Sequence, residues 1–247
     1  MKTYVMIPTY NERENIGKLI QEIVNLKISD LHIVVVDDNS PDGTAKEVQK
    51  YASKHPEIEL LLRTTNRGRG SAGIAGFQYA LDHGADYIVE MDADFSHHPK
   101  YIPAMLNALQ NADMVIGSRF VSGGRDVNRG IVRRIVTFLA GVYVRILLGL
   151  KINDVSSGYR CFKRKVLEAI QLGTMISTGP SIVSEVFYRA HVKGFSIKEI
   201  PIEFEDRIHG ETKLNYKILL KTLLMVLKFK QLHKKGLLFE TVSKRNT

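Results

Sequence analysis

The chain alternates short apolar runs with segments in which apolar residues recur every three or four positions. The apolar runs predict β-strands at 4–7, 32–36, 58–62, 87–91 and 114–116. The segments between them predict helices at 14–26, 42–55, 71–83 and 99–111. Ser40 and Pro41 are expected to cap and begin the second of these helices. Strands separated by such helices indicate βαβ units and an α/β fold with a parallel sheet.

The second half of the chain has a less regular pattern. Residues 131–150 are apolar and helix-like, although arginines interrupt them, and residues 153–160 read as a polar loop. Further on, the pattern predicts a helix at 181–191, a strand at 195–204 and a final helix at 215–235. No change in composition indicates a second independent domain. We expect a catalytic domain over 1–212 and a C-terminal amphipathic helix with a basic tail over 213–247.

Polar clusters follow three of the predicted strands, at 9–12, 37–40 and 92–94. In parallel sheets, ligands bind outside the carboxyl ends of the strands, so these clusters are expected to meet at one edge. Asp92 and Asp94 lie one residue apart and would project to the same side of an extended chain, where they could share one divalent cation. A single Asp-x-Asp pair equally fits a polar strand end with a turn. The recurrence of carboxylates at one edge favours a ligand site.

Composition narrows the choice of partners. With 247 residues and 44% hydrophobic content, the chain can form one large domain. Its net charge of +9 favours a polyanionic partner such as nucleic acid, anionic lipid or a phosphorylated substrate. The single cysteine, Cys161, excludes an intrachain disulfide and fits a reducing compartment. Because we find neither a signal-peptide pattern nor a sufficiently long apolar run, we expect a cytoplasmic protein without a transmembrane helix.

Several motifs resemble those of family 2 inverting glycosyltransferases and occur in the same order. They are PTYNE at 8–12, VDDNSPDGT at 36–44, MDAD at 91–94 and GSR at 117–119. With SHHP at 96–99 and RIHGETKL at 207–214, the chain resembles the dolichyl-phosphate (polyprenyl-phosphate) mannosyltransferases. The resemblance implies a glycosyltransferase-A (Rossmann-like) fold with a mostly parallel sheet flanked by helices. It also implies a GDP-mannose donor, a Mg²⁺ or Mn²⁺ ion, a polyprenyl (dolichyl) phosphate acceptor and inversion at the sugar.

The same resemblance assigns residues to the donor and the metal. Nucleotide contacts are implied for Pro8, Tyr10, Glu12 and Asp37. Asp92 would lie near the metal and the diphosphate, and Asp94 would be the principal metal ligand. Some members carry Gln where this chain has Ser96, so either the shorter Ser96 hydroxyl or a water would complete the metal shell. The metal would act as a Lewis acid and stabilise the charge that builds on the leaving phosphate.

Basic residues supply the remaining implied contacts. Arg119 would bind near the sugar or phosphates, and Arg207 and Lys213 would bind the donor diphosphate, although a solvated basic loop is the alternative for that pair. Arg133 and Thr137 would hold the acceptor phosphate; they are four residues apart and share one face of a helix. A phosphate monoester has a second pKa of about 6, so the acceptor is already ionised and needs no strong general base.

The C-terminal segment suggests contact with a membrane surface. Residues 213–235 contain seven lysines and no acidic residue, and apolar side chains cover most of the rest of the predicted helix. This pattern favours an interfacial helix at the cytosolic face of a membrane, with 131–150 as its companion. A helix packed on the sheet with a solvated lysine stripe is the alternative. A membrane-anchoring subunit is a further candidate partner.

Three other functions remain in view. Gly68, Gly70 and Gly73 satisfy G-x-G-x-x-G and leave an NAD(P)-dependent oxidoreductase open, although the motif falls in the third βα unit. A nucleic-acid binder is disfavoured, because the lysines cluster on an apolar helix without interleaved aromatic residues. A UDP-glucose-dependent polyprenyl-phosphate glucosyltransferase, or another family 2 enzyme, fits the same motifs. His97 and His98 are adjacent, which does not suit a shared zinc ion, so a turn residue and a packed residue are expected.

Overall fold

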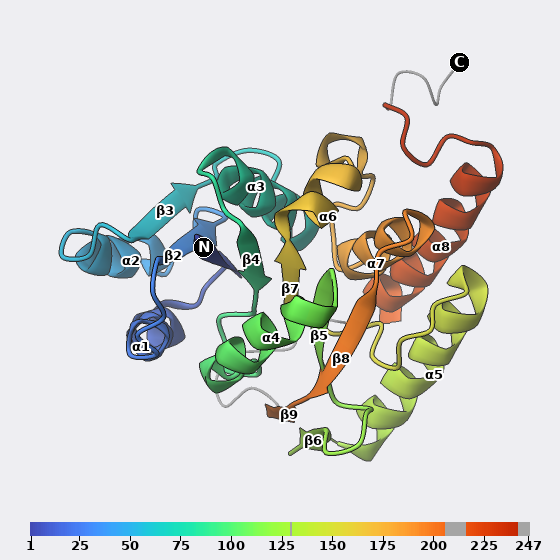
Figure 1. The fold of residues 1–247 in the computed structure, drawn as a ribbon, viewed down its shortest axis with the longest axis horizontal. Helices are drawn as coiled ribbons and strands as arrows, with labels where there is room; N and C mark the ends of the chain where they lie inside the picture. Colours follow the sequence, from blue (N-terminus) through green and yellow to red (C-terminus); the bar gives the residue numbers. More distant parts are fainter. Residues whose placement is uncertain (129, 206–215, 242–247) are drawn as a thin grey trace.

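The computed structural model describes residues 1–128, 130–205 and 216–241. The first part alternates strands and helices, as the hydrophobic pattern predicts (Figure 1). Its elements are β1 (Thr3–Thr9), α1 (Arg13–Val24), β2 (Leu31–Asp37), α2 (Thr44–Ala52), β3 (Ile58–Leu62), α3 (Arg69–Asp82), β4 (Tyr87–Glu90), the 3₁₀ turn η1 (Pro99–Tyr101), α4 (Ile102–Ala108), η2 (Leu109–Asn111) and β5 (Met114–Ser118). The remainder comprises β6 (Arg125–Val127), α5 (Ile131–Leu148), β7 (Arg160–Lys163), α6 (Arg164–Ala169), η3 (Leu172–Thr174), α7 (Ile182–Val192), β8 (Ile197–Pro201), β9 (Glu203–Glu205) and α8 (Tyr216–Lys234).

A mostly parallel sheet forms the centre of the molecule. Among the described residues, seven strands pair in the order β3-β2-β1-β4-β7-β5-β8. All neighbouring pairs are parallel except those of β7, which runs antiparallel to β4 and β5. The predicted α/β fold is therefore confirmed. The sequence did not predict β7, because its apolar part is only Cys161 and Phe162, between basic residues, which is too short to show a period.

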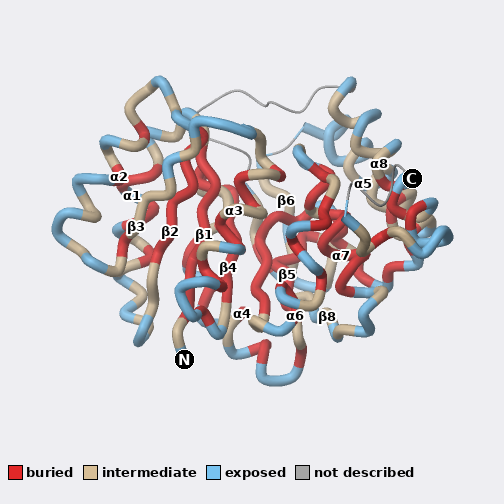
Figure 2. The backbone as a smooth tube through the Cα atoms, turned by 90° about the horizontal axis from the view of Figure 1, so that it is seen from above, coloured by how far each residue is buried: buried red, intermediate tan, exposed pale blue. Residues whose placement is uncertain are grey.

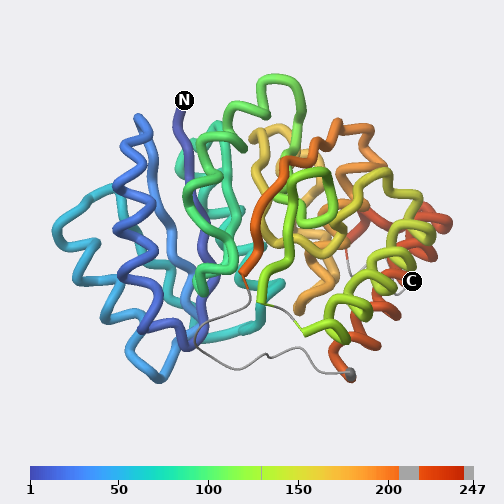
Figure 3. Tube along the Cα trace, turned by 90° about the horizontal axis from the view of Figure 1, so that it is seen from below, coloured from blue at the N-terminus to red at the C-terminus, as the bar shows by residue number. Residues whose placement is uncertain are grey.

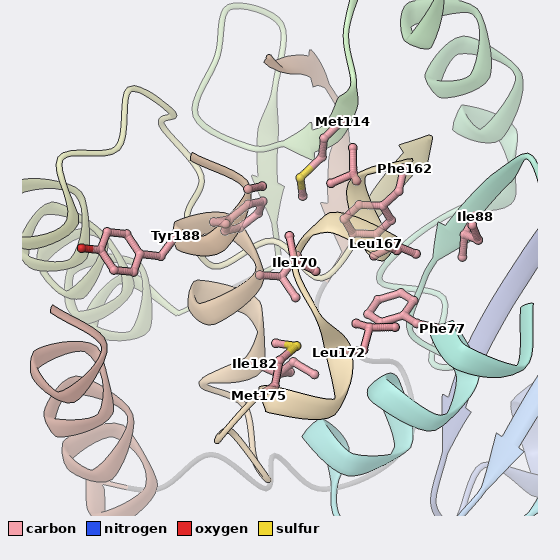
Figure 4. Close-up of a cluster of buried hydrophobic side chains, with 14 of the residues drawn as sticks. Phe77, Ile88, Met114, Phe162, Leu167, Ile170, Leu172, Met175, Ile182 and Tyr188 are labelled. Carbon is pink, nitrogen blue, oxygen red and sulfur yellow. The ribbon is translucent and has the colours of Figure 1, made fainter. Parts of the chain in front are cut away.

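Alternation along the strands divides the core into two layers. Tyr4 and Met6 of β1 belong to a cluster with α3, α6 and α7, part of which Figure 4 shows in close-up. Val5 and Ile7 face the opposite way and pack with α1, α2 and α4. Because successive side chains of a strand point to opposite faces, each strand of the sheet serves both layers. Figure 2 shows the buried strands enclosed by helices whose outer sides are exposed.

The start of α2 differs from the prediction. Ser40 is not its N-cap, because both its N–H and its hydroxyl donate to the carboxylate of Asp37. The helix begins at Thr44, after Gly43 in a left-handed conformation with φ of 92°. The Asp42 carboxylate accepts hydrogen bonds from the N–H of Thr44 at 2.9 Å and from its hydroxyl at 2.6 Å. The turn that contains Asp37 and Asp42 therefore shifts the start of the helix from the predicted residue 42 to Thr44.

The predicted strand 195–204 is also interrupted. β8 ends at Pro201, and β9 leaves the main sheet to pair in parallel with β6. The chain changes partner at Ile202, whose N–H still donates to the Ser118 carbonyl of β5 at 3.0 Å while its carbonyl accepts from the N–H of Arg125 in β6 at 2.9 Å. Phe204 of β9 is consequently placed beside the candidate site rather than in the core.

Helices α5 and α8 lie side by side at one end of the molecule (Figures 1 and 3). The Tyr143 hydroxyl donates to the Leu223 carbonyl at 3.3 Å, and the Lys230 ammonium donates to the Leu147 carbonyl at 2.5 Å. Phe229 of α8 is fully buried in the same hydrophobic cluster as α3 and α7. The structure thus packs one side of α8 on the domain. Nowhere in the described ranges does a helix combine the length and apolar character needed to cross a membrane.

Candidate active site

The carboxyl ends of β1, β2 and β4 open into a cavity of about 680 Å³. Pro8, Tyr10 and Glu12, which the sequence analysis assigns to the nucleotide, are in its wall. Its other walls come from the loop before α3 and the segment before α7. The full lining is Pro8, Thr9, Tyr10, Glu12, Asp38, Arg67, Gly68, Arg69, Ala72, Asp92, Ala93, Asp94, Thr178, Gly179, Pro180 and Ile218. We call this space the donor cavity.

The two carboxylates at the end of β2 have different roles in the structure. Asp37 is fully buried and accepts hydrogen bonds from Thr9 and Ser40, so it joins β1 to the turn that follows β2. Asp38 lines the donor cavity, and its carboxylate accepts from Arg63 at 2.7 Å and from the N–H of Gly68 at 2.6 Å. The family resemblance implies a nucleoside contact for Asp37, whereas in the structure Asp38 lines the cavity.

Asp92 and Asp94 both line the donor cavity, just beyond the end of β4. One oxygen of Asp94 accepts hydrogen bonds from the N–H and the hydroxyl of Ser96. This contact makes Ser96 a donor that orients Asp94. No group of three or more His, Cys, Asp or Glu side chains within the described ranges could hold a metal ion. Two carboxylates facing an open cavity nevertheless fit a Mg²⁺-type ion, which commonly takes one or two protein carboxylates and completes its shell with waters and substrate phosphates.

His97 is a packed residue, as predicted. Its ring stacks on Tyr159 with centroids 5.1 Å apart, and its Nδ1 accepts a hydrogen bond from the N–H of Asp92 at 3.0 Å. This bond assigns the ring proton to Nε2. Burial lowers the pKa of His97 below its usual value, and the nearby carboxylates of Asp92 and Asp94 oppose this only in part. The neutral ring therefore holds the backbone of the Asp-x-Asp turn.

A second cavity, of about 300 Å³, adjoins the first. We call it the acceptor cavity. Its wall is apolar where α5 and α8 face it and polar near Asp92. Thr137 lines it, whereas Arg133, one turn earlier on α5, is exposed to solvent. Its lining comprises Arg69, Asp92, His97, Arg119, Val136, Thr137, Ala140, Gly141, Val144, Val155, Ser156, Ser157, Gly158, Pro180, Val183, Ser184, Phe204, Leu219, Thr222 and Leu223.

Arg119, in the wall of the acceptor cavity, forms a buried ion pair with Asp154. Its Nε and Nη2 donate to the two oxygens of Asp154 at 2.8 and 2.7 Å, and Nη2 also donates to the Ser156 hydroxyl at 2.5 Å. The guanidinium carbon lies 4.9 Å from the centre of the Phe204 ring. Burial opposes ionisation of Asp154, but the hydrogen bonds and charge of Arg119 outweigh it and keep the pKa of this carboxyl below its usual value. Much of the donor capacity of Arg119 is thus used inside the protein.

A chain of buried charges runs from the core to Asp92. Glu90, at the end of β4, is fully buried and accepts from Arg160 Nε at 2.7 Å and from Arg69 Nη1 at 2.8 Å. Arg69 Nη2 then donates to Asp92 at 3.2 Å. The pairing of β7 with β4 is what brings Arg160 opposite Glu90. Asp92 is therefore positioned by a network that involves three secondary-structure elements.

The G-x-G-x-x-G segment packs against protein backbone. The Gly70 N–H donates to the Thr178 carbonyl at 3.0 Å, and a Cβ on Gly70 would lie 2.7 Å from the Ser177 carbonyl oxygen. The buried carboxylate of Glu185 fixes this opposing segment by accepting from the N–H groups of Ile176 and Ser177. The glycines thus permit two walls of the donor cavity to come together.

Two predicted contacts cannot be placed, because Arg207 and Lys213 lie outside the described residues. Sequence reasoning also missed residues that the fold brings to the site: Arg67, Arg69, Asp154 and Gly158. Asp154 and Gly158 belong to the polar loop 153–160. Its several Asp, Ser and Gly residues, next to a strand, were the sequence feature that could have indicated a site. Arg69 lies within the G-x-G-x-x-G motif, which specifies the glycines and not the residues between them.

Residues 4–171 match the model described as glycosyl transferase family 2. The chain belongs to this family. As a family 2 glycosyltransferase it is an enzyme, and the oxidoreductase interpretation of the glycine motif is not retained.

Relatives of this family 2 glycosyltransferase include named mannosyltransferases. The chain is 40% identical over 215 residues to the undecaprenyl-phosphate mannosyltransferase of Micrococcus luteus, covering 87% of this chain and 88% of that protein. It is 41% identical over 216 residues to the polyprenol monophosphomannose synthase of Mycolicibacterium smegmatis, covering 87% and 81% respectively. A solved structure of glucosyl-3-phosphoglycerate synthase from Mycobacterium tuberculosis, with Mn²⁺, UDP and glucosyl-3-phosphoglycerate, superposes with a TM-score of 0.64 at 18% identity. The alignment covers 95% of this chain and 80% of that one. This last likeness concerns the fold.

Proposed function

We propose that this enzyme transfers mannose from GDP-mannose to a polyprenyl phosphate, with inversion at the sugar and dependence on a divalent metal. One observation carries the proposal: a cavity at the strand ends that is lined by four carboxylate side chains meets, at Asp92, a cavity that is lined by apolar residues of α5 and α8. A nucleotide sugar suits the first cavity and a lipid phosphate suits the second. The mannosyltransferase names of the relatives support this choice of donor sugar and acceptor.

The donor cavity has groups that suit a nucleoside diphosphate sugar. Asp38 and Glu12 offer acceptors for base or ribose, and Tyr10 offers a ring with the Arg67 guanidinium 5.4 Å from its centre. Asp92 and Asp94 would hold Mg²⁺ or Mn²⁺ beside the diphosphate. When bound, such an ion acts as a Lewis acid for the leaving phosphate. Ser96 and His97 fix the carboxylates and their turn, so the site is organised before the donor enters.

The reaction requires one bond to form as another breaks. A phosphate oxygen of the acceptor attacks the anomeric carbon, and the bond from that carbon to the β-phosphate oxygen breaks with its electron pair leaving on GDP. Because the acceptor phosphate is largely ionised near neutral pH, no proton has to be removed from it. Positioning is therefore the main contribution expected from the protein.

The end of the molecule formed by α5 and α8 supports a lipid acceptor and contact with a membrane surface. Ile131, Val132 and Ile146 of α5 are 66%, 71% and 76% exposed, an unusual amount of apolar surface for one helix. Large exposed apolar side chains on the two helices also include Ile135, Val136, Phe138, Leu139, Leu220, Leu224 and Leu227. Exposed basic residues on the same helices, among them Arg134 and Lys221, complement anionic headgroups.

A panel of radiolabelled nucleotide sugars tests the proposal directly. Purified enzyme is incubated with polyprenyl phosphate and each sugar nucleotide, with Mg²⁺, with Mn²⁺ or with a chelator. We expect label to enter the organic phase only from GDP-mannose and only with metal. Label from UDP-glucose instead would assign the glucosyltransferase alternative, and label that stays water-soluble throughout would refute a lipid acceptor.

A further inference from the structure

Arg69 occupies the point where the donor and acceptor cavities meet. Arg69, Asp92 and Pro180 line both spaces. The side chain of Arg69 begins at the N-terminus of α3 and retains 26% of its exposure despite its ion pairs. A partly exposed guanidinium at this position faces the region through which the sugar must pass between substrates.

The hydrogen bonds of Arg69 leave it able to bind a ligand. Within the described part of the chain, its Nη1 donates to Glu90 at 2.8 Å and its Nη2 donates to Asp92 at 3.2 Å. A guanidinium carries five N–H donors in a planar fork, so further donors remain for an oxyanion. Glu90 does not depend on Arg69 alone, because Arg160 also pairs with it. Arg69 is therefore not the only cation that neutralises the buried carboxylate of Glu90.

Gly158 keeps the space in front of this guanidinium open. A Cβ at Gly158 would lie 3.4 Å from His97 Cε1, 3.5 Å from Arg69 Nη2 and 3.6 Å from Asp92 Oδ2. These are ordinary van der Waals distances, so a methyl group would fit but would occupy the junction. The missing side chain thus leaves a contact surface made of a cation, a carboxylate and an imidazole edge.

Arg69 is the cationic side chain best placed to meet an anion at this junction. Among the described residues that line the acceptor cavity, the cationic side chains are Arg69 and Arg119. Arg119 is paired through two nitrogens with Asp154 and is only 6% exposed. An acceptor phosphate approaching the donor must also pass the Asp92 carboxylate, and like charges repel. Arg69 can offset that repulsion because it contacts Asp92 and faces the cavity.

We propose that Arg69 binds the phosphate of the acceptor at the junction while it positions Asp92. The inference rests on the proposed function, since it takes a phosphate monoester as the acceptor. In the transfer, the phosphate oxygen bonds to the anomeric carbon as the carbon–oxygen bond to the donor diphosphate breaks. The leaving diphosphate keeps the electron pair. Arg69 holds the attacking phosphate and exchanges no proton.

Steady-state kinetics of Arg69 variants test this role. The assay varies a short-chain polyprenyl phosphate and GDP-mannose separately. Loss of a charge-assisted hydrogen bond predicts that Arg69→Met raises the KM for the polyprenyl phosphate by about 10- to 100-fold. The KM for GDP-mannose should rise less, because Asp94 still supplies its carboxylate when Asp92 loses the contact with Arg69. Arg69→Lys keeps the charge without the fork and should fall between wild type and Arg69→Met.

The control is Arg164→Met, which removes an arginine paired with Glu168 on α6, away from both cavities. It should leave both KM values unchanged. Equal increases of both KM values in Arg69→Met, or no increase for the polyprenyl phosphate, would overturn the proposal. Arg69→Lys provides the same comparison if Arg69→Met does not fold.

A second variant tests the junction without removing a charge. Gly158→Ala should retain the wild-type melting temperature, because the added Cβ meets its neighbours at van der Waals distances. It should lower kcat/KM for the polyprenyl phosphate by about 10- to 100-fold, because misplacement of a reacting group is costly. Gly173→Ala is the matched control, since a Cβ there meets nothing within 4 Å. An unchanged kcat/KM in a folded Gly158→Ala enzyme would mean that the sugar is not transferred at this junction.

Direct binding separates this inference from the proposed function. Calorimetric titration with the short-chain polyprenyl phosphate measures acceptor affinity without turnover. If wild type transfers no sugar, the proposed function fails, yet weaker binding by Arg69→Met would still support an anion site at Arg69. If wild type is active and both proteins bind the phosphate equally, the proposed function stands and the role of Arg69 is refuted.

Discussion

The donor cavity and the acceptor cavity are built from different kinds of structure. Strand ends and their turns surround the donor cavity, and its carboxylates already accept hydrogen bonds from the protein: Asp38 from Arg63 and Gly68, and Asp94 from Ser96. Helices α5 and α8 form much of the acceptor cavity, and their outer sides expose apolar residues. One region is thus organised by internal polar contacts, whereas the other leaves apolar surface without protein cover.

This difference reflects the ligands that each region would bind. Polar groups must be fixed in advance to stabilise developing charge without reorganisation. Apolar contact is non-directional and depends on the area removed from water, so a lipid or a bilayer can complete it. Substitutions of polar side chains that are fixed by internal hydrogen bonds should therefore affect catalysis or stability sharply, whereas changes to the exposed apolar residues of α5 and α8 should act gradually.

The sharpest test of the donor side is Asp94→Asn. Loss of the carboxylate would remove the principal candidate metal ligand, and metal stabilisation of a leaving phosphate is worth several kcal/mol. We expect turnover to fall by about 10³-fold or more, with an unchanged melting temperature. Asp82→Asn, an exposed carboxylate that accepts from Gln78, is the control and should be fully active. Normal metal-dependent activity in Asp94→Asn would refute the assignment.

The buried ion pair on the acceptor side should give the largest effect on stability. Asp154→Asn leaves Arg119 without its charged partner, so we expect the free energy of unfolding to fall by about 3–5 kcal/mol, measured by urea denaturation. The pKa of Asp154 is depressed in the folded state. Its stabilising contribution is therefore present above the unfolded pKa of about 3.9 and is lost as the pH falls through the folded pKa. The difference between wild type and variant should shrink below about pH 4, and a constant difference would contradict this reading.

The apolar helices should respond more gradually. The double variant Leu220→Ser/Leu224→Ser removes two exposed leucines from α8 and should keep the melting temperature. We expect its partition coefficient to vesicles containing anionic lipid to fall by about tenfold or more, given roughly 1.5–3 kcal/mol per buried leucine. Binding by wild type should also weaken with salt. Leu62→Ser, exposed on β3 away from these helices, is the control. Equal vesicle binding by all three proteins would indicate that α8 does not contact the membrane.

Ser96→Ala should have the smallest effect. Its hydroxyl orients Asp94 by a hydrogen bond worth about 1 kcal/mol, which predicts a loss of kcat of about fivefold. The apparent affinity for Mn²⁺ should change little. A loss as large as that of Asp94→Asn would instead make Ser96 a direct metal ligand.

Much of the fold could be predicted because its signals are local. β1, β2 and β4 are nearly continuous apolar runs, as expected for buried parallel strands, and the polar residues that follow them lie at one edge of the sheet. Tyr10, Glu12, Asp92 and Asp94 were found in polar clusters that follow those strands, whereas the family resemblance supplied Pro8; all five line the donor cavity.

The remaining features depend on contacts between distant segments. Asp154 pairs with Arg119 across 35 positions, and Arg69 reaches Asp92 across 23. Nothing in a local window distinguishes such a buried arginine from a solvated one. The loss of Ser40 as an N-cap has a local cause instead, because Asp37, three residues earlier, accepts hydrogen bonds from both its N–H and its hydroxyl.

The antiparallel strand β7 has a consequence for the biosynthesis of this enzyme. It lies between β4 and β5 in the sheet. It is synthesised about 70 residues after β4, since its Arg160 pairs with Glu90. Until the ribosome has delivered it, both neighbours present unpaired backbone edges, which are templates for misassociation. Closing so long a loop also slows folding. A nascent chain that stalls near residue 120 would therefore be especially dependent on chaperones.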